Sequence, residues 1–429
     1  MMPSQKFLRP ALLLIGMIAY AVFFFCGIPG IPFHPDEATQ IWMSGDVKTT
    51  LQRPAELAYS THPDDELRQH YRLIDAPLAR TMIGFGYLLT GQTPLASDWD
   101  WSAGWEENNL AGALPSADQL LIARLAVSIW MIPALYAFFR TLRRFASLPV
   151  SLAGAAILAL QAGLLLHTRR AMAEPLLLAL YLFILWAIFR PYSFKNLMLV
   201  ACLLGLVFQT KQTGLPLIAA VMIIYAARGW KDARWKGLAA SILLPALAII
   251  LFACILNPVA WKNPLQVGGM MLHERLLFSR SQFSTLLEAG SGLALPGVPA
   301  RLAGILAQVF IAPPAFYDVG NYAQELSFSI AHYQHSLFHH LFSGWVWGGI
   351  LFTAVLASLV IAAVQLAKKQ LSWYSPQVVM AFILTLHVIF FGAFLNIGFQ
   401  RYYLPLVPQL LLLVMFTIGN LTARDKKQG

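Results

Sequence analysis

Uninterrupted apolar runs of about 20 residues recur through the whole chain, and no other feature of the sequence restricts its fold as strongly. A helix of this length can cross the hydrocarbon core of a bilayer, where each backbone polar group must be paired within the segment itself. The runs that we interpret as spans are residues 11–30, 119–139, 150–167, 173–190, 196–210, 213–228, 237–257, 342–367, 377–398 and 402–421. They predict an all-α bundle.

Two weaker apolar stretches, residues 77–90 and 300–313, are short and flanked by proline. Such stretches fit surface-lying or re-entrant helices better than full crossings. We therefore expect a polytopic membrane helical bundle of about 10 to 12 spans. The composition agrees, because 58% of the 429 residues are hydrophobic and only 12% are charged, too few charges to cover this much apolar surface in water.

Basic residues gather in the short segments between alternate runs, and they set the orientation. If the N-terminus is cytoplasmic, the cytoplasmic segments hold two acids, Asp232 and Asp425, and 16 basic residues: Lys6, Arg9, Arg140, Arg143, Arg144, Arg190, Lys195, Arg228, Lys231, Arg234, Lys236, Lys368, Lys369, Arg424, Lys426 and Lys427. This satisfies the positive-inside rule at every cytoplasmic segment. We expect an integral multi-pass protein of a bacterial plasma (inner) membrane with both termini cytoplasmic. The net charge of +10 is then a topology signal, and no nucleic acid is expected as a partner.

This orientation gives the outer face two long polar segments, residues 31–118 and 258–341, whereas every cytoplasmic loop is short. Loops of this length carry function more often than connection alone. We expect a single transmembrane domain over residues 1–429, with a first outer catalytic loop at residues 31–118 and a second outer loop at residues 258–341. The chemistry should then lie on the outer face.

The first outer loop opens with His34-Pro35-Asp36-Glu37, two adjacent carboxylates a few residues beyond the first apolar run. Near a low-dielectric boundary a carboxylate needs a partner, and its pKa can be held where it accepts a proton. Asp36 would then suit a general base. The structural alternative is that Asp36 caps a short helix that starts at Glu37, a common position for aspartate. Residue types and spacing leave both interpretations open.

Basic residues that face outward oppose the topology signal, which indicates that they have another role. Arg169 and Arg170 precede Glu174 between the third and fourth runs, and Lys211 lies in the turn between the fifth and sixth. These three cations could neutralise a phosphate or pyrophosphate. Glu174 followed by Pro175 is also an ordinary helix start, and Lys211 could instead reach lipid headgroups.

The second outer loop contains a run of histidines whose spacings would place the imidazoles on one helical face: His332, His335, His339 and His340. Such a face could bind a divalent metal together with Asp36 or Glu174, or it could hydrogen-bond a sugar. No motif of established ligand spacing is present, so the sequence identifies no certain cofactor.

The order of these features resembles the GT-C superfamily of membrane glycosyltransferases, especially the protein O-mannosyltransferases and the bacterial aminoarabinose transferases. The resemblance covers most of the chain in order. It runs through His34-Pro35-Asp36-Glu37, the segment from Arg169 and Arg170 to Glu174-Pro175, Lys211, and the closing Gln400-Arg401-Tyr402-Tyr403-Leu404-Pro405-Leu406-Val407-Pro408. The carboxylate pair is its most specific element.

The resemblance implies an enzyme that transfers a hexosyl or pentosyl sugar, with inversion, from a polyprenyl-phosphate donor to an acceptor hydroxyl on the non-cytoplasmic face. Asp36 takes the position of the catalytic base, and Glu37 supports it. Glu174 matches a second acidic position that some members use with a metal and that is more often aspartate. The remaining site residues that we expect are Arg169, Arg170, Lys211 and Arg401 for the donor phosphate, and Glu174, His34, His335, His339 and Tyr402 for substrate or a metal.

The expected partners are the polyprenyl-phosphate sugar, membrane lipid, and an acceptor that could be a lipid, a glycan or a protein. The main rival from another class is a multi-pass transporter or a lipid or glycolipid flippase. Such proteins tend to show internal repeats and ionisable residues at mid-membrane. Repeats are not evident in this sequence, and charges inside the apolar runs are scarce, with Arg124 as an exception.

Overall fold

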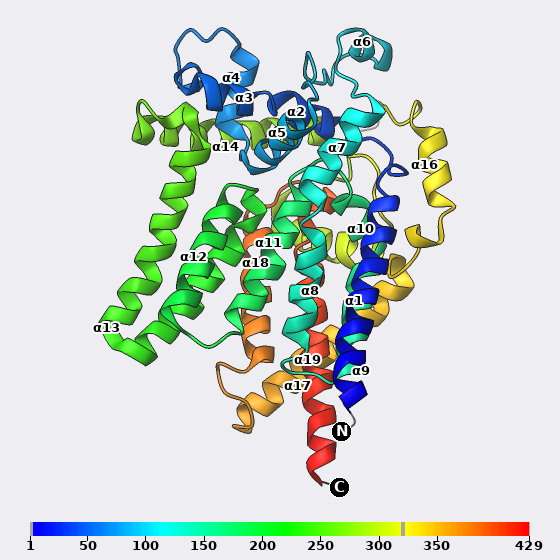
Figure 1. Cartoon of the computed structure of the whole chain (residues 1–429), viewed down its shortest axis with the longest axis vertical. Coiled ribbons are helices and arrows are strands. Elements are labelled where there is room, and N and C mark those ends of the chain that lie inside the picture. Colours follow the sequence, from blue (N-terminus) through cyan, green and yellow to red (C-terminus); the bar gives the residue numbers. More distant parts are fainter. Residues whose placement is uncertain (1–2, 319–321, 429) are drawn as a thin grey trace.

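The computed structural model describes residues 3–318 and 322–428, and the regular elements within these ranges are helices. Strand pairing there is limited to one antiparallel bridge between Ala294 and Ile397. Long apolar helices form a bundle, and shorter helices cover one of its ends (Figure 1). A helix satisfies its own backbone hydrogen bonds, as a lipid-facing segment must. The expected all-α class is therefore confirmed.

Five helices within the described ranges are long and apolar enough to cross a membrane, or six if a helix pair bent by 56° forms one span. The bent pair is α9 (Leu148–Leu160) with α10 (Ala162–Thr168). Three of the five are Gln212–Leu256, α17 (Gly344–Ala367) and α18 (Pro376–Phe394). The fourth, Ala117–Leu142, joins α7 (Ala117–Ser128) to α8 (Met131–Leu142). The fifth, Gln400–Thr422, includes most of α19 (Leu406–Gln428). The chain is thus an integral multi-pass membrane protein.

The expected 10 to 12 spans exceed this count, and short helices are one reason. α11 (Glu174–Ile188) and α12 (Phe194–Phe208) match two expected runs, but each has 15 residues. A helix of that length measures about 22 Å, less than the hydrocarbon core of about 30 Å. α1 (Pro3–Cys26) matches the first expected run, and its Leu13–Cys26 part is also among the shorter apolar helices.

Another reason is that two expected runs, residues 213–228 and 237–257, fall within α13 (Leu215–Leu256). The backbone of α13 leaves helical geometry at Ala233 and Arg234. A β-carbon on Gly229 would lie 2.3 Å from the carbonyl oxygen of Gly237, whereas residues eight positions apart in a continuous helix are separated by about 12 Å. α13 therefore folds back on itself, and its two arms correspond to the two expected runs.

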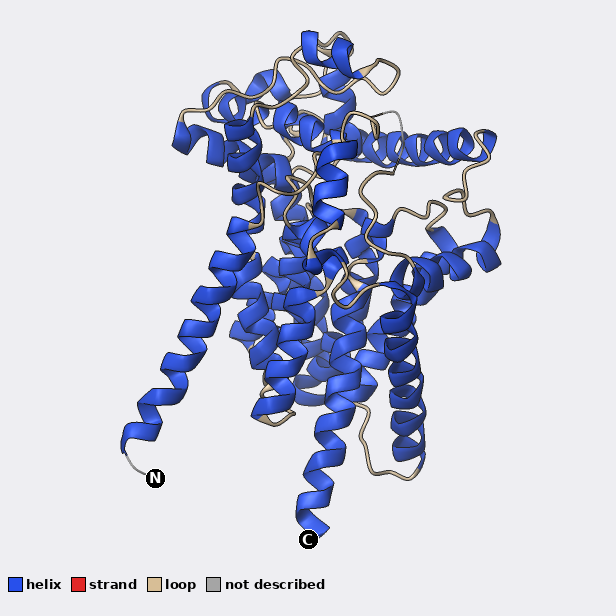
Figure 2. Cartoon of the chain, turned by 90° about the vertical axis from the view of Figure 1, so that its right-hand side faces the viewer, coloured by secondary structure: helices blue, strands red, loops and turns tan. Residues whose placement is uncertain are grey.

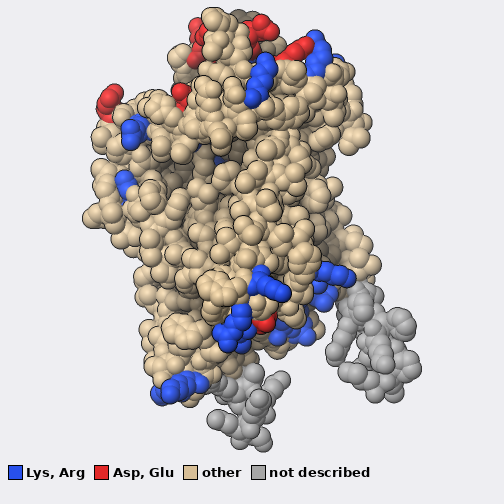
Figure 3. All heavy atoms as spheres, turned by 90° about the vertical axis from the view of Figure 1, so that its left-hand side faces the viewer, with Lys and Arg blue, Asp and Glu red and all other residues tan. Residues whose placement is uncertain are grey.

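The two ends of the bundle differ in charge. α1 begins and α19 ends at the same end of the bundle (Figure 1). On the face drawn in Figure 3, most Lys and Arg side chains gather at that end, and most Asp and Glu side chains gather at the opposite end. The separation of charge that the sequence predicts is therefore present in three dimensions.

Short helices from the two long polar segments cover the acidic end (Figure 1). They are α2 (Pro35–Met43), α3 (Asp46–Gln52), α4 (Glu66–Ile74), α5 (Leu78–Thr90), α6 (Trp105–Leu110), α14 (Pro264–Glu288), α15 (Gly297–Leu306) and α16 (Ser327–Gln334). α14 lies across the ends of the spans at the acidic end of the bundle (Figure 2). The weaker apolar stretches form α5 and α15, the latter followed by a short π-helix (Ala307–Ile311), and neither is among the candidate spans.

The spans differ in how much of their surface the protein covers. The span Gln400–Thr422 is central, because 83% of its most apolar window is buried inside the protein, whereas the corresponding fraction for the α13 span is 11%. The outer end of the central span therefore lies beneath the short helices of the acidic end. Arg401 lies at that end of the span, and this places it next to the first outer loop.

Candidate active site

The first turn of α2 is fixed by its own residues. Nδ1 of His34 accepts a hydrogen bond from the Asp36 backbone N–H (3.2 Å), and Oε2 of Glu37 accepts one from the His34 backbone N–H (3.0 Å). Pro35 occupies the first helical position, where its missing N–H costs nothing. The capping residue is therefore His34. The alternative in which Asp36 caps a helix starting at Glu37 is wrong, and the Asp36 carboxylate is available for other contacts.

Glu37 is fully buried. Its two carboxylate oxygens accept hydrogen bonds of 2.8 Å each from Nε and Nη2 of Arg124 in α7, and Oε1 also accepts one from the Ala171 backbone N–H (2.7 Å). Burial raises the pKa of this carboxyl, but the Arg124 guanidinium outweighs burial and holds the pKa of Glu37 below its usual range. Glu37 is therefore ionised, paired and closed off from solvent.

Arg124 also fixes the chain just before α2. Its Nη1 donates to the carbonyl oxygens of Ile28 (3.0 Å) and Ile31 (2.9 Å). The Arg124–Glu37 pair thus joins the end of α1, the start of α2, α7, and the turn before α11. Bidentate pairs between guanidinium and carboxylate are the geometrically specific ones. The supporting role expected for Glu37 therefore has a physical basis, since this pair positions the helix that carries Asp36.

Asp36 contacts a different cation, Arg401 of the 3-10 helix η6 (Gln400–Tyr403). Nη1 of Arg401 donates to Oδ2 of Asp36, and Nη2 lies 2.8 Å from Oδ2 of Asp318 in an ion pair. The same Asp318 oxygen lies 3.3 Å from Nε2 of His34. Because Nδ1 of His34 accepts a hydrogen bond, Nε2 is the ring nitrogen that faces Asp318. Four side chains from three distant segments thus form one cluster.

Asp36 is the accessible carboxylate of this cluster. Its side chain is 34% exposed, against 9% for Asp318. Burial raises the pKa of each of these carboxyls, but Arg401 and His34 together outweigh burial and hold both pKa values below the usual range. Both groups are therefore carboxylates at neutral pH. Asp36 can accept a hydrogen bond, and then a proton, from a hydroxyl that enters from outside.

Lys211, Glu174 and Tyr402 form a second group beside the first. Nζ of Lys211 donates to Oε1 of Glu174 and lies 4.6 Å from the centroid of the Tyr402 ring. The Arg401 guanidinium lies 5.6 Å from the centroid of the same ring. Tyr402 is therefore in contact with both cations. Glu174 does begin α11, as an ordinary helix start would, and it is in addition the counter-ion of Lys211.

Arg169 and Arg170 donate hydrogen bonds to backbone carbonyls. Nη2 of Arg169 donates to the Phe23 carbonyl (3.0 Å), and its guanidinium packs against the Phe23 ring at 5.0 Å from the centroid. Arg170 is fully buried, and its Nη2 donates to the Phe316 carbonyl (2.7 Å). Both cations therefore fix the backbone of neighbouring segments. The geometry brings Lys211 and Arg401 together and leaves Arg169 and Arg170 outside that group.

The histidines of the second outer loop do not share a helical face. α16 ends at Gln334, before His335, and His339 belongs to a separate 3-10 helix (Leu337–His339). His335 is exposed, whereas His339 is buried and stacks on Phe316 with ring centroids 5.1 Å apart. Within residues 3–318 and 322–428, no group of three or more His, Cys, Asp or Glu side chains is placed to hold a metal. The expected metal-binding face is therefore not formed.

Three residues of the site region were missed by sequence reasoning or left without a role. Asp318 is the only aspartate between residues 258 and 341, and this could have drawn attention to it. Arg124 is a charge inside an apolar run, which requires a buried partner. His167 of α10 is buried, and neither of its ring nitrogens has a hydrogen-bond partner in the described part of the chain. No spacing in the sequence indicates which side chains these three residues approach in the fold.

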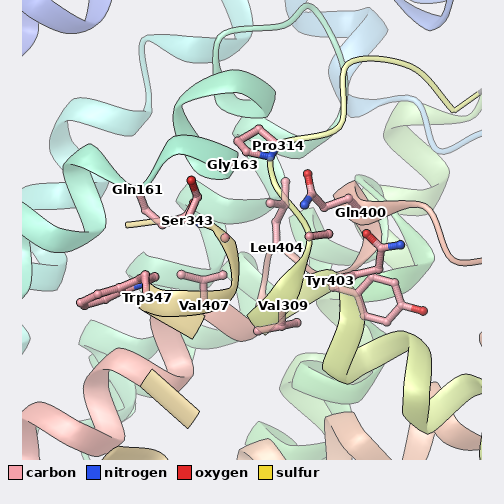
Figure 4. A pocket seen from close by; sticks show the side chains of 13 residues that line it. Gln161, Gly163, Val309, Pro314, Ser343, Trp347, Gln400, Tyr403, Leu404 and Val407 are labelled. Carbon is pink, nitrogen blue, oxygen red and sulfur yellow. The ribbon is translucent and has the colours of Figure 1, made fainter. Parts of the chain in front are cut away.

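A pocket of about 410 Å³ opens beside the segment that carries Arg401 (Figure 4). Its lining includes Gln161 at the bend between α9 and α10, Trp347 at the start of α17, and Gln400 and Tyr403 of η6. The Gln400 side chain accepts from the Ala315 N–H (2.8 Å) and donates to a neighbouring carbonyl of the second outer loop. A group bound in this pocket would therefore touch η6 and the second outer loop together.

Comparison with known proteins gives matches among solved structures only, since no family model and no curated protein matches the chain. The oligosaccharyltransferase of Archaeoglobus fulgidus, in complex with zinc and sulfate, is similar with a TM-score of 0.47 and 11% identity, over 92% of this chain and 46% of that one. Its apo form gives a TM-score of 0.49 and 10% identity, over 97% of this chain and 52% of that one. The chain thus spans about half the length of the oligosaccharyltransferase.

ArnT from Cupriavidus metallidurans, bound to undecaprenyl phosphate, is similar with a TM-score of 0.40 and 16% identity. The match covers 95% of this chain and 78% of ArnT. The matches to both proteins cover most of this chain at low sequence identity.

The Arg124–Glu37 pair generates a prediction about stability. Glu37→Gln leaves the Arg124 guanidinium buried without a counter-ion, so we expect the free energy of unfolding to fall by about 3 to 5 kcal/mol. Thermal unfolding in detergent would measure this, with Asp36→Asn as the matched control that stays close to the wild type. The double variant Glu37→Gln with Arg124→Gln should recover part of the loss. An unchanged unfolding temperature for Glu37→Gln would contradict this role of the pair.

Proposed function

We propose that the protein is a membrane glycosyltransferase that moves a hexosyl or pentosyl sugar from a polyprenyl-phosphate donor to an acceptor hydroxyl, with inversion. The single observation that carries this proposal is the pairing of an accessible carboxylate, Asp36, with a buried guanidinium, Arg401, at the acidic end of an apolar bundle. Glycosyl transfer needs a base for the incoming hydroxyl and positive charge for the departing phosphate. Asp36 and Arg401 provide both groups in direct contact.

The reaction that we propose has one displacement step. The Asp36 carboxylate takes the proton of the acceptor hydroxyl, and the hydroxyl oxygen attacks the anomeric carbon from the side opposite the phosphate. The bond between the anomeric carbon and the phosphate oxygen breaks, and the polyprenyl phosphate leaves with the bonding electron pair. Arg401 and Lys211 stabilise the negative charge that develops on the phosphate. Glu37 and Arg124 hold α2 in place throughout.

The Arg401 guanidinium is shared between Asp36 and Asp318 in the protein without substrate. A donor phosphate that approaches Arg401 would compete with Asp36 for the same N–H donors. Loss of this contact removes the influence that holds the pKa of Asp36 down, while the influence of burial, which raises it, remains. Binding of the donor would therefore make Asp36 a stronger base at the moment when the acceptor hydroxyl needs one.

A lipid-linked donor fits this site better than a nucleotide sugar. The basic residues of the opposite end of the bundle support a cytoplasmic position for that end under the positive-inside rule, and we propose that the site faces outward. Nucleotide sugars are made in the cytoplasm, and the sequence contains no Gly-rich phosphate loop that opens a helix. We propose a bacterial inner membrane as the location, and a lipid, glycan or protein as the acceptor.

The assignment of Asp36 predicts a loss of activity without a loss of structure. Asp36→Asn keeps the shape of the side chain and removes its basicity, so we expect transfer to fall about a hundredfold or more. Purified enzyme would be offered the sugar on polyprenyl phosphate or on a nucleotide, with the same acceptor extract, and labelled sugar would be followed. Asp64→Asn, an exposed carboxylate of the same loop, is the control and should remain active. Transfer from the nucleotide sugar alone would rule out the donor assignment.

The contact between Asp36 and Arg401 predicts a change in the pH profile. Because the pKa of Asp36 lies below its ordinary value, wild-type kcat/KM should lose activity only below the pH range in which an aspartate ordinarily titrates. Arg401→Gln removes the cation and leaves the burial, so the pKa of Asp36 should rise and the acidic limb should move to higher pH. Arg280→Gln, an exposed arginine of α14, should leave the profile unchanged. An acidic limb that stays in place in Arg401→Gln would show that Asp36 is not the titrating group.

The proposed orientation predicts which positions an impermeant reagent can reach. Single cysteines at Asp64 and Glu106, after replacement of Cys26, Cys202 and Cys254, should react with an impermeant maleimide in intact cells, because both positions lie in exposed parts of the first outer loop. Single cysteines at Lys231 and Lys368 should react only after permeabilisation. The opposite pattern would overturn the orientation and move the site to the cytoplasm.

A further inference from the structure

A second pocket, of about 350 Å³, lies apart from the Asp36 cluster, at the junction of α3, α5 and the outer end of α13. Its lining includes Asp46, Thr50, Arg72, Arg80, Thr81 and Asn257. The candidate span Gln212–Leu256 ends at Leu256, and residues 256–259 also line the pocket. The pocket is therefore at the level where a span leaves the hydrocarbon core, which is where lipid headgroups lie.

The charges around this pocket do not balance. Asp46 accepts two hydrogen bonds from Arg72, of 2.8 and 2.9 Å, and it lies 3.3 Å from the Arg68 guanidinium. Two further carboxylates are paired nearby, Asp65 with Arg68 at 3.4 Å and Asp75 with Arg275 at 3.4 Å. Among the described residues, Arg80 makes no ion pair. Arg80 is thus the guanidinium of this region without a direct carboxylate partner, although Asp46 and Asp75 are near enough to attract it.

Arg80 is only 6% exposed, although it lines the pocket. Its hydrogen bond within the described chain runs from Nη1 to the Tyr71 carbonyl oxygen (3.3 Å), and a guanidinium has five N–H donors. Burial lowers the pKa of Arg80, the nearby Asp46 and Asp75 carboxylates raise it, and the neighbouring Arg72 and Arg68 lower it, with a net shift below the ordinary value. A buried cation with so few partners is costly unless an anion completes its contacts.

The pocket also has groups suited to a hydroxyl-bearing ligand. Oδ1 of Asn257 is buried and has no hydrogen-bond partner, while its Nδ2 is held by Oε1 of Gln209 (2.7 Å). An unpaired acceptor beside an unpaired cation fits a group that has both negative charge and a hydroxyl. A phosphate group has this chemistry, either when singly protonated or when esterified to an alcohol with free hydroxyls.

We propose that this pocket binds the phosphate group of an anionic ligand, with Arg80 as the main contact. The phosphate could belong to the headgroup of a membrane lipid or to a soluble phosphorylated compound, because both present the same chemistry to Arg80. None of the pocket residues belongs to the Asp36 cluster. The proposal therefore stands independently of the transfer reaction, and it is tested by binding and not by turnover.

The first test uses the wild-type protein in detergent with inorganic phosphate as the probe. Its thermal unfolding temperature would be followed as chloride is replaced by phosphate at constant ionic strength and pH, because a ligand that binds only the folded state stabilises it. We expect stabilisation of the wild type that saturates with phosphate. Equal stability in phosphate and chloride would exclude free phosphate as the ligand. Retention of lipid in nanodiscs would then decide whether the pocket binds a phosphate headgroup.

Two variants locate the site. Arg80→Gln removes the unmatched charge, and Thr81→Met fills the pocket while every charge remains, so it stays informative if Arg80→Gln fails to fold. Each should weaken phosphate binding at least tenfold, which corresponds to about 1.4 kcal/mol. Arg53→Gln is the matched control, because Arg53 is an exposed arginine of the same outer loop that does not line the pocket. Wild-type affinity in both pocket variants would overturn the assignment.

The second test separates the two sources. Wild type and the two pocket variants would be placed in phosphatidylcholine nanodiscs with and without phosphatidylglycerol, and lipid retained on the protein would be identified by native mass spectrometry. Retention of phosphatidylglycerol by the wild type, reduced at least tenfold in the variants, assigns the pocket to a lipid headgroup. Phosphate binding without lipid retention assigns it to a soluble phosphorylated ligand. Neither phosphate binding nor selective lipid retention in the wild type overturns the proposal entirely.

Discussion

The outer face of this protein depends on one buried ion pair, Glu37 with Arg124. A fully buried carboxylate is unfavourable unless its oxygens are paired, and here both oxygens are used by one guanidinium and by the Ala171 backbone N–H. The same guanidinium holds the carbonyl oxygens of Ile28 and Ile31. The pair thereby fixes where α1 ends and where α2 begins. Asp36 directly precedes Glu37 in the first turn of α2, so its position depends on the same pair.

The two adjacent carboxylates acquire different roles because successive residues of a helix point in different directions. Glu37 turns into the bundle and becomes a structural anion, while Asp36 keeps a third of its side chain accessible. Four carboxylates face four cations in this region: Asp36, Glu37, Glu174 and Asp318 face Arg124, Arg170, Lys211 and Arg401. The site without substrate is thus electrostatically neutralised by its own residues. A phosphate must displace a carboxylate from a cation in order to bind, and Asp36 is the most exposed of those carboxylates that the ion pairs report.

Features that depend on local pattern could be predicted from the sequence, whereas pairings between distant segments could not. The apolar runs predict the helices, and even the fold-back of α13 corresponds to two separate runs, because a polar stretch interrupts the apolar pattern there. The Asp36–Arg401 contact joins residues 365 positions apart, and no spacing rule reports such a contact. The family resemblance indicated Arg401 as a site residue, but it did not indicate Asp318. The histidine run misled for a related reason, since helical spacing implies a shared face only if the helix continues, and α16 ends before His335.

The two basic sites at the acidic end of the bundle, one beside Asp36 and one at the pocket of Arg80, differ in whether their cations have carboxylate partners. Beside Asp36, both Arg401 and Lys211 already have carboxylate partners, so an anion can contact them only by displacing a carboxylate. Displacement of Asp36 from Arg401 would raise the pKa of Asp36, so anion binding and the basicity of Asp36 are coupled. At the second pocket Arg80 has no carboxylate to give up, so an anion gains the contact without displacing one. A site built for turnover benefits from the first arrangement, because the leaving phosphate can be replaced by the returning carboxylate. A site built to hold an anion benefits from the second, because no carboxylate has to leave the guanidinium before an anion can contact it.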